Sequence, residues 1–227
     1  MAIFVNEKTK VLVQGLTGGQ GRFHGLRNRD YGTQVVAGVT PGKAGQDVEG
    51  IPVFDTVESA VAATGATASF IAVPPKAAPA AILEAARAGI GFVVCITEGV
   101  PAQDEARVFA TLQRDFPKTR LLGPNCPGII SPGKCNIGIT AGEIAALPTK
   151  TGPNVGIVSR SGTLTYQALY ELKQRNIGVS TCVGIGGDPI IGTNQIDVLK
   201  MFQDDAGTEA ILMMGEIGGT AEEEAAA

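Results

Sequence analysis

Glycine residues gather in one short segment of this 227-residue chain, Gly15-Leu-Thr-Gly-Gly-Gln-Gly21. The apolar run Val11–Gln14 precedes the segment and predicts a strand, and a helix is expected to follow it. A strand, a glycine turn and a helix in this order place backbone N–H groups and a positive dipole end against a phosphate. The spacing departs from the dinucleotide pattern G-x-G-x-x-G, because Thr17 and Gly18 replace its second glycine. The segment therefore predicts a phosphate-binding loop, with a plain tight turn as the alternative.

A second polar position follows the next apolar run, Thr33–Val39, which continues as Thr-Pro-Gly-Lys43. A site for NAD places an acidic residue there to bind the ribose hydroxyls. This chain has no carboxylate at that point, and Lys43 contributes positive charge instead. A phosphorylated ribose fits this arrangement better, either the 2′-phosphate of NADP or the 3′-phosphate of coenzyme A. The alternative interpretation of Lys43 is a solvated lysine on a surface turn.

Further polar residues stand where later strands are expected to end. Thr97 and Glu98 follow the run Phe92–Ile96, and ligands of parallel sheets lie beyond the carboxyl ends of the strands. Without a ligand, Glu98 would be an acidic residue in the first turn of a helix. Asn125 and Cys126 lie between two prolines on a rigid loop. A nucleophilic Cys126 would need an activating base, so a small thiol that lines a pocket is the preferred interpretation.

Three loops in the second half of the chain share this arrangement. Ser161 and Gly162 join an expected strand to a helix, Gly184–Pro189 ends the next strand, and Gly215–Gly219 ends the one after it. Loops that end parallel strands meet at one edge of the sheet, so a shared anion site is predicted. The alternative for Ser161 is an ordinary helix N-cap. Glu216 would repel a phosphate and is predicted to orient a cationic or imidazole group, unless it is a surface glutamate.

Alternating apolar runs and amphipathic stretches must position these residues, and the alternation predicts an α/β fold with parallel sheets. Gly and Pro punctuate the stretch between the two alternating parts, which indicates a connector with a short β-ribbon. We expect two α/β domains, over residues 1–128 and 154–227, joined by a connector over 129–153. The expected strands are Val11–Gln14, Thr33–Val39, Ser69–Val73, Phe92–Ile96, Leu121–Leu122, Val155–Val158, Val179–Gly184 and Ala210–Met214, and the expected helices are Pro79–Ala88, Ala102–Phe116, Thr163–Arg175 and Gln195–Phe202.

Composition excludes several function classes. The net charge of −4 argues against a protein that binds nucleic acid through global positive charge. The longest uncharged stretch, residues 59–75, is too short and too broken by proline to span a membrane, and no signal peptide is evident. The four cysteines form no C-x-x-C pair, and His24 is the one histidine, which argues against a zinc site and against a hydrolase with a histidine base. We expect reduced thiols, no bound metal and a soluble, intracellular protein.

The carboxyl-terminal residues predict a helix that has hardly begun. Thr220-Ala-Glu-Glu223 fits a capping box, but only Glu224 and three alanines follow it. A helix this short is marginal in water. A second domain of three strands would also leave an open parallel edge. We therefore expect a truncated form whose second domain is incomplete.

Taken together and in order, these loops resemble the alpha subunit of succinyl-CoA synthetase along the whole chain. The resemblance implies a Rossmann-like domain that binds coenzyme A, followed by a flavodoxin-like ligase domain. It implies that Asn125, Cys126 and Pro127 lie near the thiol of coenzyme A and that Tyr166 meets the carboxylic acid substrate. Ser161 and Gly162 would bind phosphate, and Glu216 would orient a phosphorylated histidine. The other residues that match coenzyme A positions of the family are Thr17, Gly18, Gly19, Gln20, Lys43, Ile96, Thr97 and Glu98.

The resemblance also implies a reaction and a partner. In this family a histidine carries a phosphoryl group while succinate and coenzyme A are joined at the expense of ATP or GTP. A beta subunit supplies the nucleotide site and Mg²⁺. The family's phosphohistidine lies beyond residue 227, and His24 does not match it. We therefore expect this form to bind coenzyme A without completing phosphoryl transfer, in the cytoplasm or, in a eukaryote, the mitochondrial matrix.

Three alternatives remain open from the residues. A malate–CoA ligase would share nearly every motif. An NADP-dependent oxidoreductase would share the first glycine loop but leave the loops at Ser161, Gly187 and Glu216 unexplained. A non-catalytic module that binds coenzyme A would lack a beta-type partner. Titration with coenzyme A and with NADP separates a ligase from an oxidoreductase, and a binding assay with a beta subunit separates the non-catalytic module.

Overall fold

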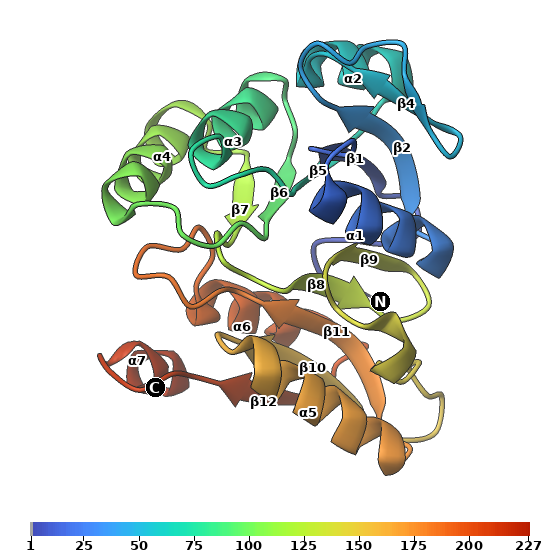
Figure 1. Ribbon diagram of the computed structural model, residues 1–227. Coiled ribbons are helices and arrows are strands. Elements are labelled where there is room, and N and C mark those ends of the chain that lie inside the picture. The colour runs from blue at the N-terminus through green and yellow to red at the C-terminus, as the bar shows by residue number, and fades with distance from the viewer. Residues whose placement is uncertain (1) are drawn as a thin grey trace.

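Parallel strands organise the amino-terminal half of the molecule. A computed structural model describes residues 2–227, which form a seven-stranded and a five-stranded sheet (Figure 1). The first sheet has the order β3-β4-β2-β1-β5-β6-β7, and every pairing in it is parallel except that of β3 with β4. Its strands are β1 (Lys10–Gln14), β2 (Gln34–Val39), β3 (Asp47–Val48), β4 (Ile51–Phe54), β5 (Ala68–Ile71), β6 (Phe92–Cys95) and β7 (Arg120–Leu122).

Helices cover both faces of this sheet. The helices are α1 (Gly19–Tyr31), α2 (Val57–Thr64), α3 (Ala78–Arg87) and α4 (Ala102–Asp115). Helices α2, α3 and α4 pack in a row on one face, and α1 lies on the other, next to β9 (Figure 1). Local sequence explains their ends: the Thr56 side chain accepts the N–H of Ser59 to start α2, and Gly65 ends α2 with a φ of 68°.

The second sheet combines a parallel part with an antiparallel hairpin. Its order is β12-β10-β11-β8-β9, in which β10 pairs in parallel with β11 and β12, and β8 runs antiparallel to β11. The strands are β8 (Gly128–Ser131), β9 (Cys135–Gly138), β10 (Asn154–Ser159), β11 (Gly178–Gly184) and β12 (Ala210–Met214). The helical elements are η1 (Gly142–Ile144), α5 (Gly162–Gln174), α6 (Gln195–Gln203) and α7 (Ala221–Ala226). Within residues 2–227, no helix combines the length and the apolar character needed to cross a membrane.

One hydrophobic cluster connects the two sheets. It contains Val13 and Phe70 of the first sheet together with Ile129 and Val183 of the second, all of them fully buried. The amino-terminal segment joins this cluster, and the rings of Phe4 and Phe92 stack at a centroid distance of 5.3 Å. A second cluster fills the space between the first sheet and helices α2, α3 and α4. The two sheets are therefore packed against each other through apolar side chains.

The predicted α/β architecture is confirmed, and every expected strand and helix is present with bounds that differ by a few residues. Sequence reasoning missed β3, β4 and α2. The predicted ribbon is the β8–β9 hairpin, and it belongs to the second sheet. The expectation of three strands in that sheet is wrong, because the hairpin raises the number to five within the described residues.

The predicted capping box at the start of α7 does not form. Thr220 stands at the N-cap, but its hydroxyl donates to the Glu224 carboxylate at 2.7 Å and caps no backbone N–H. Glu223, the expected reciprocal partner, is therefore not held by the cap. The Thr220 hydroxyl donates to the Glu224 carboxylate because a charged acceptor makes the stronger hydrogen bond.

Candidate functional site

The glycine loop between β1 and α1 is folded tightly by its own backbone. Gly15 has a φ of 90° and donates its N–H to the carbonyl of Val39 at 2.8 Å, and Gly18 donates to the carbonyl of Gly15 at 2.9 Å. A Cβ on Gly21 would lie 2.1 Å from the Gly15 oxygen, so glycine is required where α1 approaches the loop. Gly19 has open space around it instead. Helix α1 begins there, with first-turn N–H groups that have no partner inside the helix.

Two adjoining cavities lie along the carboxyl edge of the first sheet. They share Gly18, Ala72, Val73 and Pro74, so together they form one groove that passes the start of α1. We call it the edge groove. The first cavity, of about 420 Å³, lies between β2 and α3 and is largely apolar. Its other lining residues are Gln14, Gly15, Thr17, Val39, Thr40, Pro41, Ala77, Ala80, Ala81 and Glu84.

The second cavity of the edge groove has a volume of about 550 Å³ and a more polar lining. Thr97 lies at its floor, where its hydroxyl donates to the Val73 carbonyl at 2.8 Å and ties the ends of β5 and β6 together. Glu98 is exposed beside it. The cavity is also lined by Gly19, Gln20, His24, Ile96 and Ile139. An anion at this place would face the amino end of α1, which carries partial positive charge.

The edge groove brings together most of the predicted ligand positions. Seven of them line it: Thr17, Gly18, Gly19, Gln20, Ile96, Thr97 and Glu98. Asn125 is not among the lining residues, but its N–H donates to the carbonyl of Thr97 at 3.0 Å, so its loop abuts the groove. Pro127 is buried, and a Cβ on Gly184 would lie 2.1 Å from its ring. Pro127 thus packs against β11.

Lys43 lies on the exposed turn after β2 and does not line either cavity of the edge groove. The sequence argument placed no carboxylate near this turn, and that argument is wrong. Asp55, which follows β4, accepts the backbone N–H groups of Lys43 and Ala44 at 2.9 Å each. Asp55, the residue after the missed strand β4, therefore holds the backbone of this turn. The side chain of Lys43 is left on the surface of the turn.

The interpretation of Cys126 as a thiol that lines a pocket is also wrong. Its side chain is part of the core, at 4% exposure, with Sγ against the carbonyls of Cys95 and Leu122. Burial is the main cause that raises the pKa of this thiol far above its usual range. A neutral, enclosed thiol cannot act as a nucleophile. All four cysteines are free and buried, as the expectation of reduced thiols requires.

Sequence reasoning missed several residues that line the edge groove. Thr40 follows β2 directly, and its hydroxyl lies 3.1 Å from that of Thr17. Gln14 ends β1, and its amide donates to the Ser69 hydroxyl and the Ala81 carbonyl. For both Thr40 and Gln14, the sequence signal that could have identified them is a polar residue at the carboxyl end of an apolar strand. His24 gave no such signal, and its pKa is lowered by burial and by the nearby Arg27.

A second cluster surrounds the amino end of α5. Ser161 is an N-cap whose hydroxyl accepts the N–H of Leu164 at 3.3 Å, and Gly162 opens the helix. A Cβ on Gly187 would lie 3.9 Å from the carbonyl of Arg160, so the loop after β11 approaches this helix end. Two of the three predicted loops are thus neighbours.

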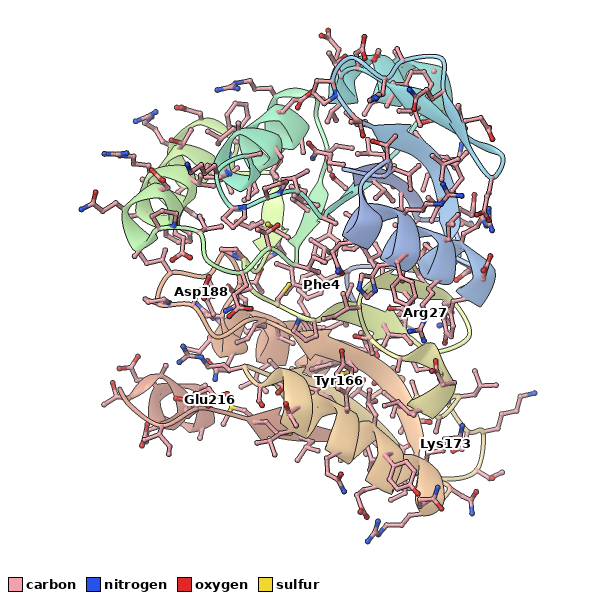
Figure 2. The ribbon with its side chains drawn as sticks, viewed as in Figure 1. Phe4, Arg27, Tyr166, Lys173, Asp188 and Glu216 are labelled. Atoms are coloured by element: carbon pink, nitrogen blue, oxygen red, sulfur yellow. The ribbon has the colours of Figure 1, made fainter. Side chains whose placement is uncertain are left out.

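Glu216, in the third predicted loop, is exposed, and its backbone N–H donates to Glu222 Oε1 at 3.2 Å. Glu222 also accepts the side-chain amide of Gln195 at 3.0 Å, and Arg160 lies 3.9 Å from the same oxygen. The position of Glu216 at the carboxyl end of β12 is seen in Figure 2. Sequence reasoning missed Glu222, which connects the Glu216 loop to Arg160 and to Gln195 at the start of α6. As one of three adjacent glutamates, it gives no signal in the sequence.

Tyr166 connects α5 to Ile139, the residue that follows β9. It lies on α5, half-buried, and its hydroxyl donates to the carbonyl of Ile139 at 3.3 Å (Figure 2). Ile139 lines the second cavity of the edge groove, so Tyr166 lies directly behind that wall. Burial raises the pKa of the Tyr166 phenol.

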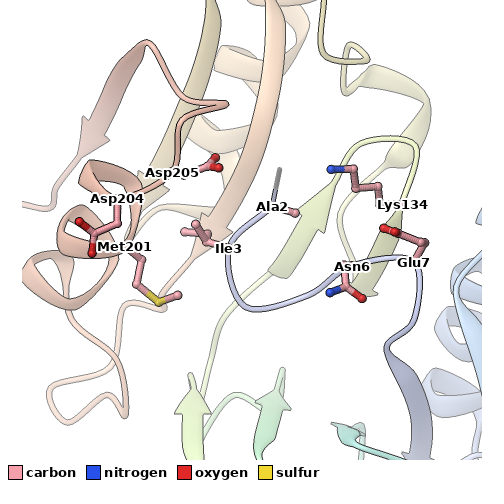
Figure 3. Close-up of a pocket in the computed structure, with 8 residues that line it drawn as sticks. All are labelled: Ala2, Ile3, Asn6, Glu7, Lys134, Met201, Asp204 and Asp205. Carbon is pink, nitrogen blue, oxygen red and sulfur yellow. The ribbon is translucent and has the colours of Figure 1, made fainter.

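Another cavity lies away from all predicted site residues. It has a volume of about 550 Å³ and opens between the amino-terminal segment, the β8–β9 turn and α6 (Figure 3). Its lining residues are Ala2, Ile3, Asn6, Glu7, Lys134, Met201, Asp204 and Asp205. Its carboxylates give it an acidic character, unlike the edge groove at the start of α1.

Two family models match separate parts of the chain. Residues 6–99 match a family model described as a CoA binding domain, and residues 158–227 match one described as CoA-ligase. The chain is 58% identical over 226 residues to the succinate–CoA ligase [ADP-forming] subunit alpha of Aquifex aeolicus, and 57% identical to that of Staphylococcus aureus strain N315. In both cases the match covers 100% of this chain and 72% of the relative.

Solved structures show the same arrangement of elements. A variant of the ATP citrate lyase of Methanosaeta concilii, in complex with (3S)-citryl-CoA, superposes with a TM-score of 0.85 at 26% sequence identity. The match covers 98% of this chain and 38% of that one, so this chain spans well under half the length of the lyase. The ATP citrate lyase of Methanothrix soehngenii, in complex with citrate and coenzyme A, gives a TM-score of 0.84 at 25% identity.

Proposed function

Because the chain belongs to the family of succinate–CoA ligase alpha subunits, we propose that it binds coenzyme A in the edge groove and takes part in the ATP- or GTP-dependent joining of succinate to coenzyme A. One observation carries this proposal. The amino end of α1 opens onto two connected cavities, one apolar and one polar, which suit a nucleotide and its polar arm.

Different parts of coenzyme A occupy different parts of the edge groove. The adenine ring fits the apolar cavity beside Val39, Ala77 and Ala81, where it is removed from water. The diphosphate lies at the first-turn N–H groups of α1, next to the loop that carries Thr17. The 3′-phosphate lies toward Lys43, which supplies the positive charge on the exposed turn.

The pantetheine arm then follows the polar cavity. It passes Ile96, Thr97 and Glu98, whose backbone and side chains offer partners for its amides. Its thiol ends toward the loop of Asn125, which abuts the groove at Thr97. Cys126 and Pro127 act from behind this loop as packing residues, since both are buried.

The second cluster suits the phosphoryl part of the reaction. Ser161 and Gly162 offer a helix end to a phosphate, and Glu216 orients a phosphorylated imidazole. Tyr166 is placed to meet the carboxylic acid substrate, succinate. We propose that a beta subunit is the partner and supplies the nucleotide site and Mg²⁺.

Calorimetric titration with coenzyme A, dephospho-coenzyme A and NADP tests the proposal. Coenzyme A is expected to bind, and loss of its 3′-phosphate is expected to cost roughly 1.5–3 kcal/mol, about 10- to 150-fold in affinity. Desulfo-coenzyme A is expected to bind almost as well as coenzyme A, because the thiol serves the reaction. Tighter binding of NADP, or no binding of coenzyme A, would overturn the proposal.

Lys43→Ala identifies the group that recognises the 3′-phosphate. In this variant coenzyme A and dephospho-coenzyme A are expected to bind with nearly equal affinity, because the charged partner is gone. Lys118→Ala is the matched control: it removes the same charge from an exposed lysine that precedes β7, at the opposite edge of the sheet. It is expected to keep the full preference for the 3′-phosphate.

A further inference from the structure

Two carboxyl groups meet at the boundary between the sheets. Glu105 comes from α4 and is 4% exposed, although Asp104 beside it faces solvent and pairs with Arg107. Neither carboxylate oxygen of Glu105 has an ordinary hydrogen-bond partner among residues 2–227, and the same holds for Oδ2 of Asp188. Figure 2 shows Asp188 between the two halves of the molecule, on the loop after β11.

Asp188 is connected to the edge groove through its other oxygen. Its Oδ1 accepts the side-chain amide of Asn125 at 2.7 Å. The backbone of Asn125 in turn donates to the carbonyl of Thr97 at 3.0 Å and accepts the N–H of Gly187 at 3.4 Å. Asn125 has a φ of 50°, a conformation that needs support from its neighbours. A continuous path of contacts therefore runs from α4 through Asp188 and Asn125 to the groove.

The surroundings of Glu105 favour a neutral acid. Burial is the largest cause that raises the pKa of Glu105, to about 7, followed by the neighbouring Asp188 carboxyl group, while the N–H of Ile190 opposes the shift. The other titratable groups nearby are the thiols of Cys95 and Cys126, both neutral because burial raises their pKa. The cavity around Glu105 is otherwise lined by apolar residues and glycine, from Pro79 and Ile82 to Phe109 and Gly192. Among the described residues, no cation is a cause of the raised Glu105 pKa. The cation of a neighbouring loop is Arg160, whose backbone carbonyl approaches Gly187 and whose guanidinium pairs with Glu222.

We propose that Glu105 and Asp188 share one proton, and that this pair positions the Asn125 loop against the edge groove. The protonated Glu105 donates to Oδ2 of Asp188, whose Oδ1 accepts the amide of Asn125. Glu105 is thus a positioning residue that acts through Asp188 on the proposed site for the coenzyme A thiol. Only the identity of the ligand, coenzyme A, rests on the proposed function; the shared proton does not. Loss of the proton places two negative charges together and releases the loop.

The shared proton is testable without any ligand. Carboxyl ¹³C NMR should show Glu105 titrating with a pKa well above that of ordinary glutamates, and the side-chain amide resonances of Asn125 should follow the same midpoint. Glu105→Gln keeps the size and a donor for Asp188, so its Asn125 resonances should not change over this range. Asp104→Asn removes the adjacent, exposed carboxylate and should leave the titration as it is. A Glu105 pKa near 4.5, or Asn125 resonances that ignore it, would overturn the proposal.

Coenzyme A affinity measured against pH tests the consequence for the groove. The dissociation constant of the unmodified chain for coenzyme A should rise by up to about tenfold between roughly pH 6 and pH 8. The full rise of about tenfold is reached if the loop is held in place only when the pair is protonated. Glu105→Gln should show only the change caused by titration of coenzyme A itself, and Asp104→Asn should behave like the unmodified chain. A Glu105→Gln profile equal to the unmodified one would refute the positioning role. No binding at any pH would refute the proposed function, while the NMR titration still decides the shared proton.

Discussion

Individual residues of the glycine loop have separate physical roles. Gly21 is required by packing, because a Cβ there would meet the backbone oxygen of Gly15 at 2.1 Å. A Cβ on Gly19 would meet no heavy atom within 4 Å, and this residue lies at the exposed start of α1. The two glycines look equivalent in the sequence, but only Gly21 is fixed by the interior of the fold. Their substitution should therefore separate stability from ligand binding.

Gly21→Ala is expected to destabilise the chain by at least about 2 kcal/mol, because backbone atoms must move to admit the new methyl group. Gly19→Ala is the matched control and should leave the unfolding free energy unchanged or raise it by up to about 1 kcal/mol, since alanine is the better helix former. Urea unfolding followed by circular dichroism measures both. Equal stabilities of the two variants would contradict the packing role of Gly21.

Residues at strand ends were predictable from the sequence where the signal is local. Thr17, Thr97 and Glu98 line the groove because a parallel sheet places the ends of its strands at one edge. The environment of Lys43 was not predictable, because Asp55 arrives from a strand that the sequence pattern did not reveal. The burial of Cys126 was hidden for a similar reason: the core that covers it includes residues from both sheets.

At the level of elements, the β8–β9 hairpin is the piece that joins the two sheets. The hydroxyl of Thr33, just before β2, donates to the carbonyl of Asn136 in β9 and accepts its N–H, each at 2.8 Å. Both residues are 3% exposed, so no water replaces these bonds. Thr33 thus satisfies two backbone groups of a strand at the edge of the other sheet.

Thr33→Val is expected to lower the unfolding free energy by roughly 1–3 kcal/mol, because it leaves a buried donor and acceptor of Asn136 without a partner at nearly constant side-chain volume. Thr33→Ser retains the hydroxyl and should lose much less. Chemical denaturation of the three proteins gives the comparison. Similar losses in both variants would mean that the methyl group, rather than the hydroxyl, is what matters at this position.

The elements themselves were predictable to different degrees. Long apolar runs identified the central strands, whose burial on both faces gives a continuous signal. The segment from β3 to α2 escaped prediction because β3 has only two residues, Asp47–Val48, and because Pro52 interrupts the apolar run of β4, Ile51–Phe54. The hairpin was expected as a ribbon, but its place in the second sheet depends on pairing with β11, which is distant in the sequence and which no local pattern encodes.

The whole molecule depends on the boundary between its sheets. A single apolar cluster crosses this boundary. The Glu105–Asp188 pair also spans it, with Glu105 buried on α4 and Asp188 partly buried on the loop after β11. Glu105 has a higher pKa in the folded chain, about 7, than the usual 4.5, so the folded state holds its proton more tightly than the unfolded state. The stability contributed by this proton is fully present below pH 4.5 and is lost as the pH rises through 7.

The difference in unfolding free energy between the unmodified chain and Glu105→Gln should therefore depend on pH. Relative to the variant, the unmodified chain should lose up to about 3 kcal/mol as the pH rises from below 4.5 to above 7. Urea unfolding at a series of pH values measures this difference, and effects common to both proteins cancel. A difference that stays constant, or one that grows in favour of the unmodified chain, would contradict the raised pKa.

The pairing of β8 with β11 also sets an order of events during synthesis. The hairpin leaves the ribosome well before the strand against which it must lie, because β11 follows only after β10 and α5. Until then its apolar side chains have no permanent cover, and the first sheet is the one surface on which they can rest. The nascent chain is thus most exposed to misassembly after the hairpin has left the ribosome and before β11 has followed it, and a chaperone that acts on this protein would be needed during that interval.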